Sequence, residues 1–422
     1  MNSRPVKRWP QLLTGSLVFV CIGIVYAWSM FAGTFKASFP TWTNKDLGMT
    51  FTLIMGFFCL GNFYAGVLGE RLSTKGIFIL AAILNGVGYL GVSMIQANTL
   101  WLLYLSYGVV GSFGVGLAYN MVLSTVTKWF PDKIGAVSGT LMMSFACSTL
   151  VVGVGADALC RLVSWRYVFI GVGGLSAAAL LAAAFILKLP SPDILLPQRL
   201  AGKQHAALPT QDLSTMEMVR SSAFWLFFIW GILLLVAVYG LMGNVKQCVL
   251  DLDPNAKTLA TVSVTLLAVS NGLGRLLLGS LYDKLGRSKT MTIDTTLIIL
   301  SSIFMVAAFK THSIPLMLIG VVLTGLAYGG VPPTSSAFVV DYFGANNYSM
   351  KFGVINLFIF IGAFGSTLAG MIKDSAGSFE NLFYLLIVMG VVAMALNLLI
   401  RKPLANRPQF DQTKSTENAP TR

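Results

Sequence analysis

Long apolar runs recur along the whole chain, and they constrain its fold more than any other feature. Twelve runs can be counted, at roughly residues 10–36, 48–69, 76–96, 99–126, 135–158, 166–188, 221–246, 257–281, 289–309, 314–339, 352–372 and 379–400. A helix of about 20 apolar residues crosses the hydrocarbon core of a bilayer and satisfies its own backbone hydrogen bonds there. The pattern therefore predicts an all-α membrane protein with twelve transmembrane helices and both termini on one side.

Charged residues are few and lie mainly between these runs. They make up 11% of the chain against 55% hydrophobic residues, which leaves too little polar surface for a soluble globule of 422 residues. The formal net charge of +13 comes from short clusters of Lys and Arg rather than one basic stripe, so we expect no nucleic acid partner. Most of the 29 Lys and Arg residues occupy alternate connections on the N-terminal side, which predicts cytoplasmic termini. The compact loops favour a prokaryotic inner membrane.

Metal sites and enzyme motifs are not expected in this chain. The two histidines, His205 and His312, lie outside the apolar runs, and the five cysteines are scattered without a C-x-x-C pair. The sequence contains neither a Walker-type phosphate loop nor a serine elbow. We therefore expect no metal, no cofactor and no enzymatic activity, and we expect the apolar surface to contact membrane lipid.

The longest connection lies between the sixth and seventh runs, is polar, and carries three prolines after Pro190. It divides the chain into an N-terminal six-helix half at 1–188, a cytoplasmic linker at 189–220, a C-terminal six-helix half at 221–400 and a cytoplasmic tail at 401–422. Within the linker, Ser214 and Glu217 have the S-x-x-E spacing of a capping box, which predicts a short helix before the seventh span.

A G-x-L-x-[DE] sequence occurs in each half and joins the second span of that half to its third. The first copy begins at Gly66 and the second at Gly279. From Gly279 the chain reads GSLYDKLGRSK, which closely resembles the G-x-L-a-D-r-x-G-r-k loop of the major facilitator superfamily. This resemblance implies the major facilitator fold of two six-helix halves. In the first copy, Glu70 replaces the aspartate and Ser73 replaces the second glycine.

The same resemblance implies that these loops take part in gating. Asp283 stands at a helix end, where it can pair with basic groups or cap a neighbouring helix N-terminus in one access state only. Gly279, Arg287 and Glu70 complete the expected gating set. The alternative is a solvated loop without such a role.

Four stretches resemble the oxalate/formate antiporter family, which is itself similar to monocarboxylate transporters. They are residues 24–29, 116–139, 271–275 and 341–353. The resemblance implies a carrier of small organic anions that works by alternating access, with Arg275 facing the substrate. Residues 353–370 lack the lysine of the family's dicarboxylate-handling member, and Asn271 stands where the monocarboxylate relatives have an aspartate.

Arg275 is the one charged residue within the run 261–282. It precedes Asp283 by eight residues, which places it about 12 Å into the membrane at 1.5 Å per residue. An arginine at that depth costs roughly 2.5–3.5 kcal/mol, so its head group needs a partner or water inside the bundle. Its planar guanidinium suits a bidentate bond to a substrate carboxylate.

The alternative role for Arg275 is a structural ion pair, for which Asp157 and Asp294 are the nearest candidates along the chain. Both acids are expected at other depths than Arg275, which favours the substrate role. Asn271 lies one turn from Arg275 on the same helix face, where it can bind the anion or orient the guanidinium.

Polar and aromatic residues in the middle of other spans are candidates for the remaining substrate contacts, because an unpartnered polar group is costly there. By resemblance we favour a ring of Tyr26, Tyr119 and Tyr328 around the anion. Trp28, Asn120 and Asn356 are further candidates, and Ser29, Tyr239 and Asn244 share their character. Core packing is the alternative for each.

One fixed positive charge balances one carboxylate, so we expect a monocarboxylate such as lactate, pyruvate or formate. An oxalate/formate-type dicarboxylate exchanger and a drug or cation exporter on the same fold are the alternatives. A non-transporting sensor is disfavoured because the linker and tail are short. None of the sixteen acids falls clearly at mid-depth, which favours exchange for a counter-anion or facilitated movement. Proton symport is left open, because the substrate can itself carry a proton and Asp157 or Asp294 can lie deeper than expected.

Overall fold

The computed structural model describes residues 8–24, 28–42, 44–69, 71–160, 162–191, 212–242 and 244–402, and its regular elements are helices. The helices up to residue 191, called the first half below, are α1 (Trp9–Ile22), α2 (Trp28–Ser38), α3 (Asn44–Gly69), α4 (Thr74–Ser93), α5 (Leu100–Leu103), η2 (Tyr104–Gly111), α6 (Ser112–Thr127), α7 (Ile134–Ser148), η3 (Thr149–Gly153), α8 (Val154–Cys160) and α9 (Trp165–Ile186).

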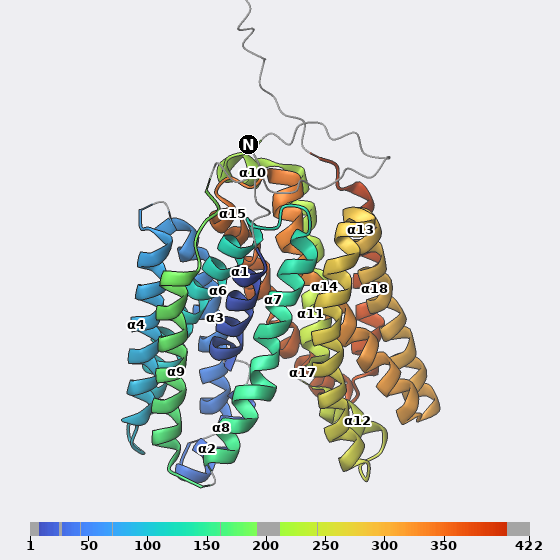
Figure 1. Cartoon of the computed structure of the whole chain (residues 1–422). Coiled ribbons are helices and arrows are strands. Elements are labelled where there is room, and N and C mark those ends of the chain that lie inside the picture. Colours follow the sequence, from blue (N-terminus) through green and yellow to red (C-terminus); the bar gives the residue numbers. More distant parts are fainter. Residues whose placement is uncertain are drawn as a thin grey trace, which may run out of the picture.

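The helices from residue 212 onward form the second half. They are α10 (Thr215–Arg220), α11 (Ser222–Met242), α12 (Val245–Leu252), α13 (Lys257–Thr311), α14 (Ile314–Phe343), α15 (Tyr348–Ile355), α16 (Leu357–Gly362), α17 (Gly365–Ala376) and α18 (Glu380–Leu399). In Figure 1 the helices of the first half, in blue to green, stand beside those of the second half, in yellow-green to red.

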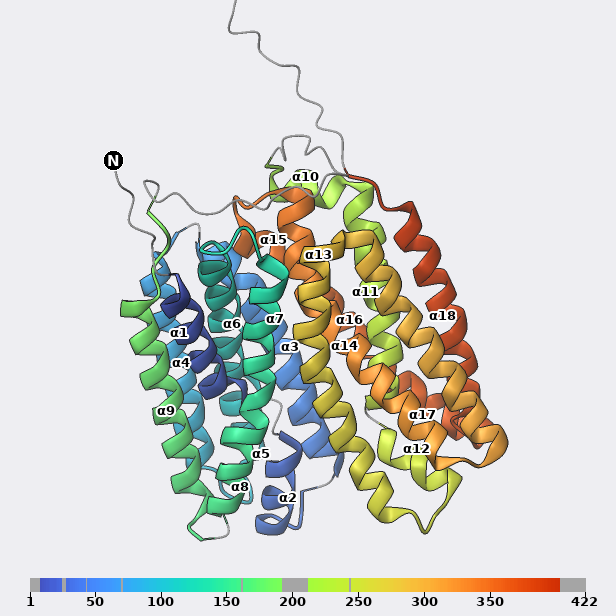
Figure 2. The same ribbon diagram turned by 45° about the vertical axis from the view of Figure 1, so that its right-hand side comes forward.

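Helix lengths confirm the membrane-spanning architecture that the apolar runs predict. In the described part of the chain, nine helical stretches are long and apolar enough to cross a membrane. The 55-residue α13 holds two expected spans, because its backbone leaves the helical conformation at Gly286, where φ is 77°. Figure 2 shows two arms that meet at that turn and spread apart toward the opposite end of the bundle. The nine long stretches therefore hold ten of the expected spans, and the first and eleventh are represented by shorter helices.

The outer surface is rich in large apolar side chains, as a lipid-facing surface requires. Leu13, Tyr167, Val388 and Leu398 are among those that lie exposed on the outer helices. Buried polar residues concentrate instead where helices face one another, as Asn62, Asn120 and Arg275 do. This distribution is the reverse of a soluble protein and fits a bundle whose solvent is hydrocarbon.

The two halves meet closely at the end of the bundle where α10 lies, called the linker end below. There Figure 2 shows α7 of the first half beside α13 of the second, whereas the ribbons of α8 and α12 diverge at the opposite end. A Cβ on Gly135 of α7 would lie 2.2 Å from Gly279 O, and one on Gly66 of α3 would lie 2.3 Å from Met350 Cα in α15. Backbones in direct contact on both sides of the interface close the bundle at this end.

The short helix predicted from Ser214 and Glu217 is confirmed as α10. Glu217 N donates to Ser214 Oγ at 3.2 Å, and Ser214 N donates to Glu217 Oε2 at 2.7 Å, which completes a capping box. The backbone just before it is held by the second half, since Leu213 N donates to Phe343 O at 3.1 Å. The linker therefore enters the second half at the loop between α14 and α15.

Candidate functional site

Arg275 lies on the first arm of α13 at the boundary between the halves. Only 2% of its surface is exposed. Its Nη1 donates to the backbone carbonyl of Met142 in α7 at 2.7 Å, and its Nε donates to Asn271 Oδ1 at 3.3 Å. Its Cζ lies 5.9 Å from the centre of the Tyr328 ring in α14. The guanidinium therefore contacts both halves, and Asn271 orients it as the helical spacing predicts.

Close helix packing holds the Arg275 backbone on two sides. A Cβ on Gly139 of α7 would lie 2.3 Å from Arg275 O, and one on Gly329 of α14 would lie 2.5 Å from Arg275 N. A larger side chain at either position would push a helix away from α13. These two glycines thus place α7, α13 and α14 around one buried cation.

The proposed structural partners of Arg275 can now be placed in part. Asp294 is fully buried, and neither of its carboxylate oxygens has a hydrogen-bond partner among the described residues. An ion pair between Asp294 and Arg275 is therefore not formed in this state. The side chain of Asp157 lies outside what the structure describes.

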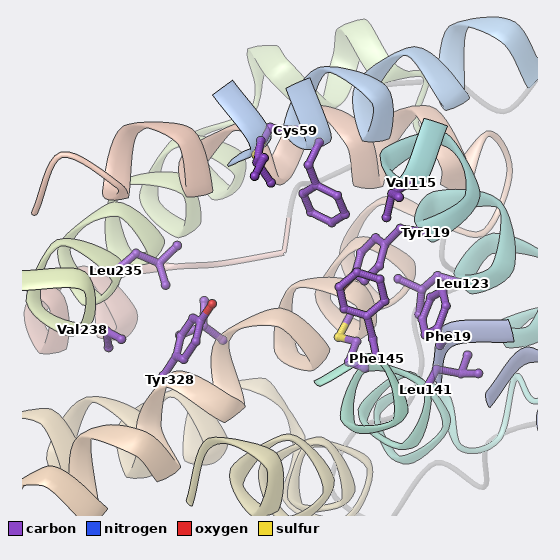
Figure 3. Close-up of a cluster of buried hydrophobic side chains, with 14 of the residues drawn as sticks. Phe19, Cys59, Val115, Tyr119, Leu123, Leu141, Phe145, Leu235, Val238 and Tyr328 are labelled. Carbon is purple, nitrogen blue, oxygen red and sulfur yellow. The ribbon is translucent and has the colours of Figure 1, made fainter. Parts of the chain in front are cut away.

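Two of the expected tyrosines line the same buried region from opposite halves. Figure 3 shows Tyr119 among Phe19 and Phe145 of the first half, and Tyr328 beside Leu235 and Val238 of the second. Tyr119 stacks on Phe19 with ring centres 5.2 Å apart. The walls of this region are thus mainly apolar, with phenol groups as the polar contribution.

The hydroxyl of Tyr328 forms a hydrogen bond of 3.0 Å with that of Tyr239 in α11. Tyr239 shared the character of the sequence candidates but was not preferred among them, because a spacing pattern does not show which hydroxyls meet. Asn244 donates to Gly240 O at 2.9 Å within the same chain segment and caps the end of α11. The described side chains thus make Tyr239 the stronger candidate of the two.

Asn356 lies at the break between α15 and α16 and is 2% exposed. Its Nδ2 has no hydrogen-bond acceptor among the described residues. A buried amide donor without an acceptor is costly unless a ligand or water completes it. This observation supports a place for Asn356 among the substrate contacts.

Asn120 and Trp28 are engaged by the protein in this state. Asn120 Nδ2 donates to Ser349 O at 2.8 Å and to Asn62 O at 2.7 Å, while its Oδ1 accepts from Ser349 Oγ at 2.8 Å. It therefore joins α6 to α15 across the two halves. Trp28 Nε1 donates to Leu47 O at 3.1 Å inside the first half. Tyr26 lies outside the described residues.

The expected gating residues divide into two groups. Asp283 accepts hydrogen bonds from Gly135 N at 3.0 Å and from Ala136 N at 2.7 Å, and so caps the N-terminus of α7 in the other half. Gly279 packs against Gly135 at the same contact. Helix capping was one of the two arrangements left open for Asp283 by the sequence.

Arg287 makes its contacts within the second half. Its Nη1 donates to Asn397 Oδ1 at 2.7 Å and to Asn397 O at 2.9 Å, which fastens the α13 turn to α18. Glu70 lies outside the described residues. The cross-half contact at this loop is therefore made by Asp283 and Gly279.

The Met142 carbonyl is the partner of Arg275 that sequence reasoning missed. Every residue has a backbone carbonyl, so the residue type at position 142 does not indicate this contact. Only the packing of α7 on α13 reveals it. Gly135 and Gly139, at i and i+4 on α7, were the available signal, because small residues at this spacing favour close helix contact.

Comparison with known proteins agrees with this architecture. The chain is 25% identical over 361 residues to the uncharacterized MFS-type transporter YhjX of Escherichia coli (strain K12), covering 84% of this chain and 86% of the relative. It is 23% identical over 385 residues to the oxalate:formate antiporter of Oxalobacter formigenes, covering 86% and 85%. It is 22% identical over 407 residues to monocarboxylate transporter 2 of Rattus norvegicus, covering 89% and 79%.

The fold is similar to that of the solved proton:xylose symporter XylE, with a TM-score of 0.74 at 14% identity over 94% of this chain and 96% of that one. The sequence matches the model of the Major Facilitator Superfamily twice, over residues 9–252 and over residues 251–421. Two matches that together span both halves leave no doubt about the family: the chain belongs to the major facilitator superfamily and is an integral membrane transporter rather than an enzyme.

Proposed function

We propose that this secondary transporter carries small monocarboxylates such as lactate, pyruvate or formate, and that Arg275 holds the substrate carboxylate. The observation that carries the proposal is a buried guanidinium at the boundary of the halves, bonded to the Met142 carbonyl at 2.7 Å. A carboxylate can replace that neutral carbonyl and gains a charge-assisted, bidentate bond in doing so. Substrate sites of such carriers lie where the halves meet.

The surroundings of Arg275 fit a small anion with an apolar end. The rings of Tyr119 and Phe145 on one side and of Tyr328 on the other provide apolar walls. The Tyr328 and Tyr239 hydroxyls are available for a hydroxyl or keto oxygen, and the open donor of Asn356 is a further candidate for such a contact. Alternating access would then release the Asp283 cap on α7 as the linker end opens.

Net charge discriminates among the alternatives. A cation or cationic drug would be repelled by the guanidinium of Arg275. A dicarboxylate needs a second positive charge, and the buried Lys351 is already used: its Nζ donates to Phe343 O at 2.6 Å and lies 3.9 Å from Asp212 Oδ1. Exchange of oxalate for formate is the second candidate, supported by the similarity to the oxalate:formate antiporter.

The test is uptake of labelled formate, lactate, pyruvate and oxalate into proteoliposomes, with and without an internal counter-anion. Arg275→Lys should weaken uptake strongly and Arg275→Ala should abolish it, while both variants still insert. Arg166→Ala is the matched control, because Arg166 donates to Ile95 O at 2.8 Å within the first half. Normal uptake by both Arg275 variants would contradict the substrate role.

A further inference from the structure

Asp294 is a buried carboxyl group that the transport scheme above does not use. It lies on the second arm of α13, eight residues beyond Gly286, and is 0% exposed. Neither of its oxygens has a hydrogen-bond partner among the described residues. Because buried carboxyl groups are normally paired or hydrogen-bonded, this one requires a physical explanation.

The described neighbours of Asp294 are largely apolar. A Cβ on Gly330 of α14 would lie 2.8 Å from Asp294 Oδ2 and 2.4 Å from Leu278 Cδ1 on the first arm of α13. The next residue, Thr295, accepts a hydrogen bond of 2.9 Å from Trp230 Nε1 of α11. Asp294 is therefore enclosed between the two arms of α13 and α14, and the neighbouring Thr295 faces α11.

Titratable groups on these helices are directed to other partners. On the first arm of α13, Arg275 turns to α7, and the Tyr282 hydroxyl donates to Asp341 Oδ2 at 3.4 Å. On α14, Tyr328 turns to Tyr239 of α11. The other charged residues of these helices lie near an end or the turn, and they are Lys257, Asp283, Lys284, Arg287, Lys289, Lys310 and Asp341. An ionised Asp294 would thus be buried without a described counter-charge, which favours the protonated form of its carboxyl group.

Near Gly330, α14 has polar groups without a described partner and a place to bend. The Pro332–Pro333 pair has no backbone N–H, so the carbonyls of Tyr328 and Gly329 lack the amide donor four residues on. The hydroxyl of Thr334, one turn beyond Gly330, is buried and has no hydrogen-bond partner among the described residues. Helices bend at such proline sites, which provides a route by which Asp294 meets water in another access state.

We propose that Asp294 binds the proton that travels with the anion, an inference that rests on the carboxylate transport proposed above. Three consecutive residues of α14 connect the two sites. The Tyr328 ring lies 5.9 Å from Arg275 Cζ, Gly329 packs on the Arg275 backbone, and Gly330 packs on the Asp294 carboxyl group. A shift of this short segment therefore acts on both sites.

Charge balance explains the coupling. In the loaded carrier the anion neutralises Arg275 and the proton neutralises Asp294. When the carrier returns empty, Arg275 is positive and Asp294, having released its proton on the other side, is negative; the state described here is the earlier one, in which the proton is bound and the anion is not. The charges of Arg275, Asp294 and their bound anion and proton sum to zero in both forms. Neither half of the cycle therefore moves a net charge through the hydrocarbon.

The first experiment compares two rates in the same proteoliposomes: uptake of labelled lactate driven by a pH gradient, and exchange of labelled for unlabelled lactate without a gradient. One proton per anion gives up to about tenfold accumulation per pH unit. In Asp294→Asn the ratio of driven uptake to exchange should fall at least tenfold. It should stay at the wild-type value in Asp253→Asn, whose altered carboxyl group caps Asn255 N in the α12–α13 connection at 2.8 Å. An unchanged ratio in Asp294→Asn would overturn the proposal.

The second experiment needs no substrate, so it separates this inference from the proposed function. Infrared spectra of the wild-type protein in lipid at neutral pH should contain the C=O stretch of a protonated carboxylic acid. That band should disappear in Asp294→Asn and shift in Asp294→Glu, which keeps a titratable group if the Asn variant folds poorly. Absence of the band from the wild type would refute the proton site even if carboxylate transport is found. If the band is present but no carboxylate moves, the proposed substrate class is wrong instead.

Discussion

Removal of the Asp283 carboxylate should open the linker end. Its two oxygens accept from Gly135 N and Ala136 N at 3.0 and 2.7 Å, so the contact combines a helix cap with a charge at the positive end of α7. A cap contributes about 0.5–2 kcal/mol, and a charge at a helix terminus about 0.3–1 kcal/mol. Asp283→Ala should therefore disfavour the closed linker end by about 1–3 kcal/mol, a change of roughly 5- to 150-fold in the ratio of closed to open.

The assay is a distance measurement between spin labels on Lys133→Cys and Lys284→Cys, two exposed positions on opposite halves at this end, with the native cysteines replaced. Double electron–electron resonance should show the longer distances gaining population in Asp283→Ala. Asp341→Asn is the control, because Asp341 pairs with Lys402 within the second half at 3.2 Å. A distribution that stays the same in Asp283→Ala, or moves equally in the control, would refute the capping argument.

Three further predictions use other parts of the molecule. Gly139→Val should reduce transport strongly, since its side chain would overlap Arg275 O, whereas Gly171→Val, with open space around its Cβ, should transport normally. Asn356→Lys should raise oxalate uptake relative to lactate in the labelled panel, because it adds a positive charge that, unlike Lys351, is not already paired; an unchanged ratio would count against selection by charge. Burial raises the pKa of Asp132, but the hydrogen bonds from Arg8 outweigh burial and leave that pKa lowered. The pair therefore stabilises the folded protein at pH values above the ordinary aspartate pKa of about 3.9, and this stabilisation is lost as the pH falls through the lowered pKa. Asp132→Asn should thus cost about 0.5–1 kcal/mol in the free energy of unfolding at pH 7 and nothing in strong acid, as measured by thermal unfolding in detergent.

Much of the fold follows from the lengths of the apolar runs, because a single segment that crosses the hydrocarbon satisfies its backbone hydrogen bonds by forming a helix. The capping box at Ser214 and the turn at Gly286 also have local causes, a side-chain cap and a positive φ. The divided first and eleventh spans were not predicted. The break in the eleventh span falls at Asn356, within an apolar run that hydropathy reads as continuous.

The candidate site was predictable where a single residue violates the pattern of its span. Arg275 stands out in that way, and its bond to Asn271 follows from helical spacing. The hydrogen bond between Asn120 and Ser349 could not be predicted in this way, because the two residues are 229 positions apart in the sequence. Asp294 was expected at another depth than Arg275, but the adjacent residues Gly329 and Gly330 pack on Arg275 and on the Asp294 carboxyl group, and that group has no described hydrogen-bond partner.

The linker end is held by different chemistry on its two sides, which has a consequence for how it opens. Between α7 and α13 the contact is the carboxylate of Asp283 on a helix terminus, and between α6 and α15 it is the neutral pair of Asn120 and Ser349. Salt screens a charge near the membrane surface, with a Debye length of about 8 Å at physiological ionic strength, but leaves hydrogen bonds between neutral groups nearly unchanged. High salt should therefore loosen the α7–α13 side while Asn120 still holds α6 to α15, so the halves would part as a hinge about the α6–α15 contact rather than as two rigid plates.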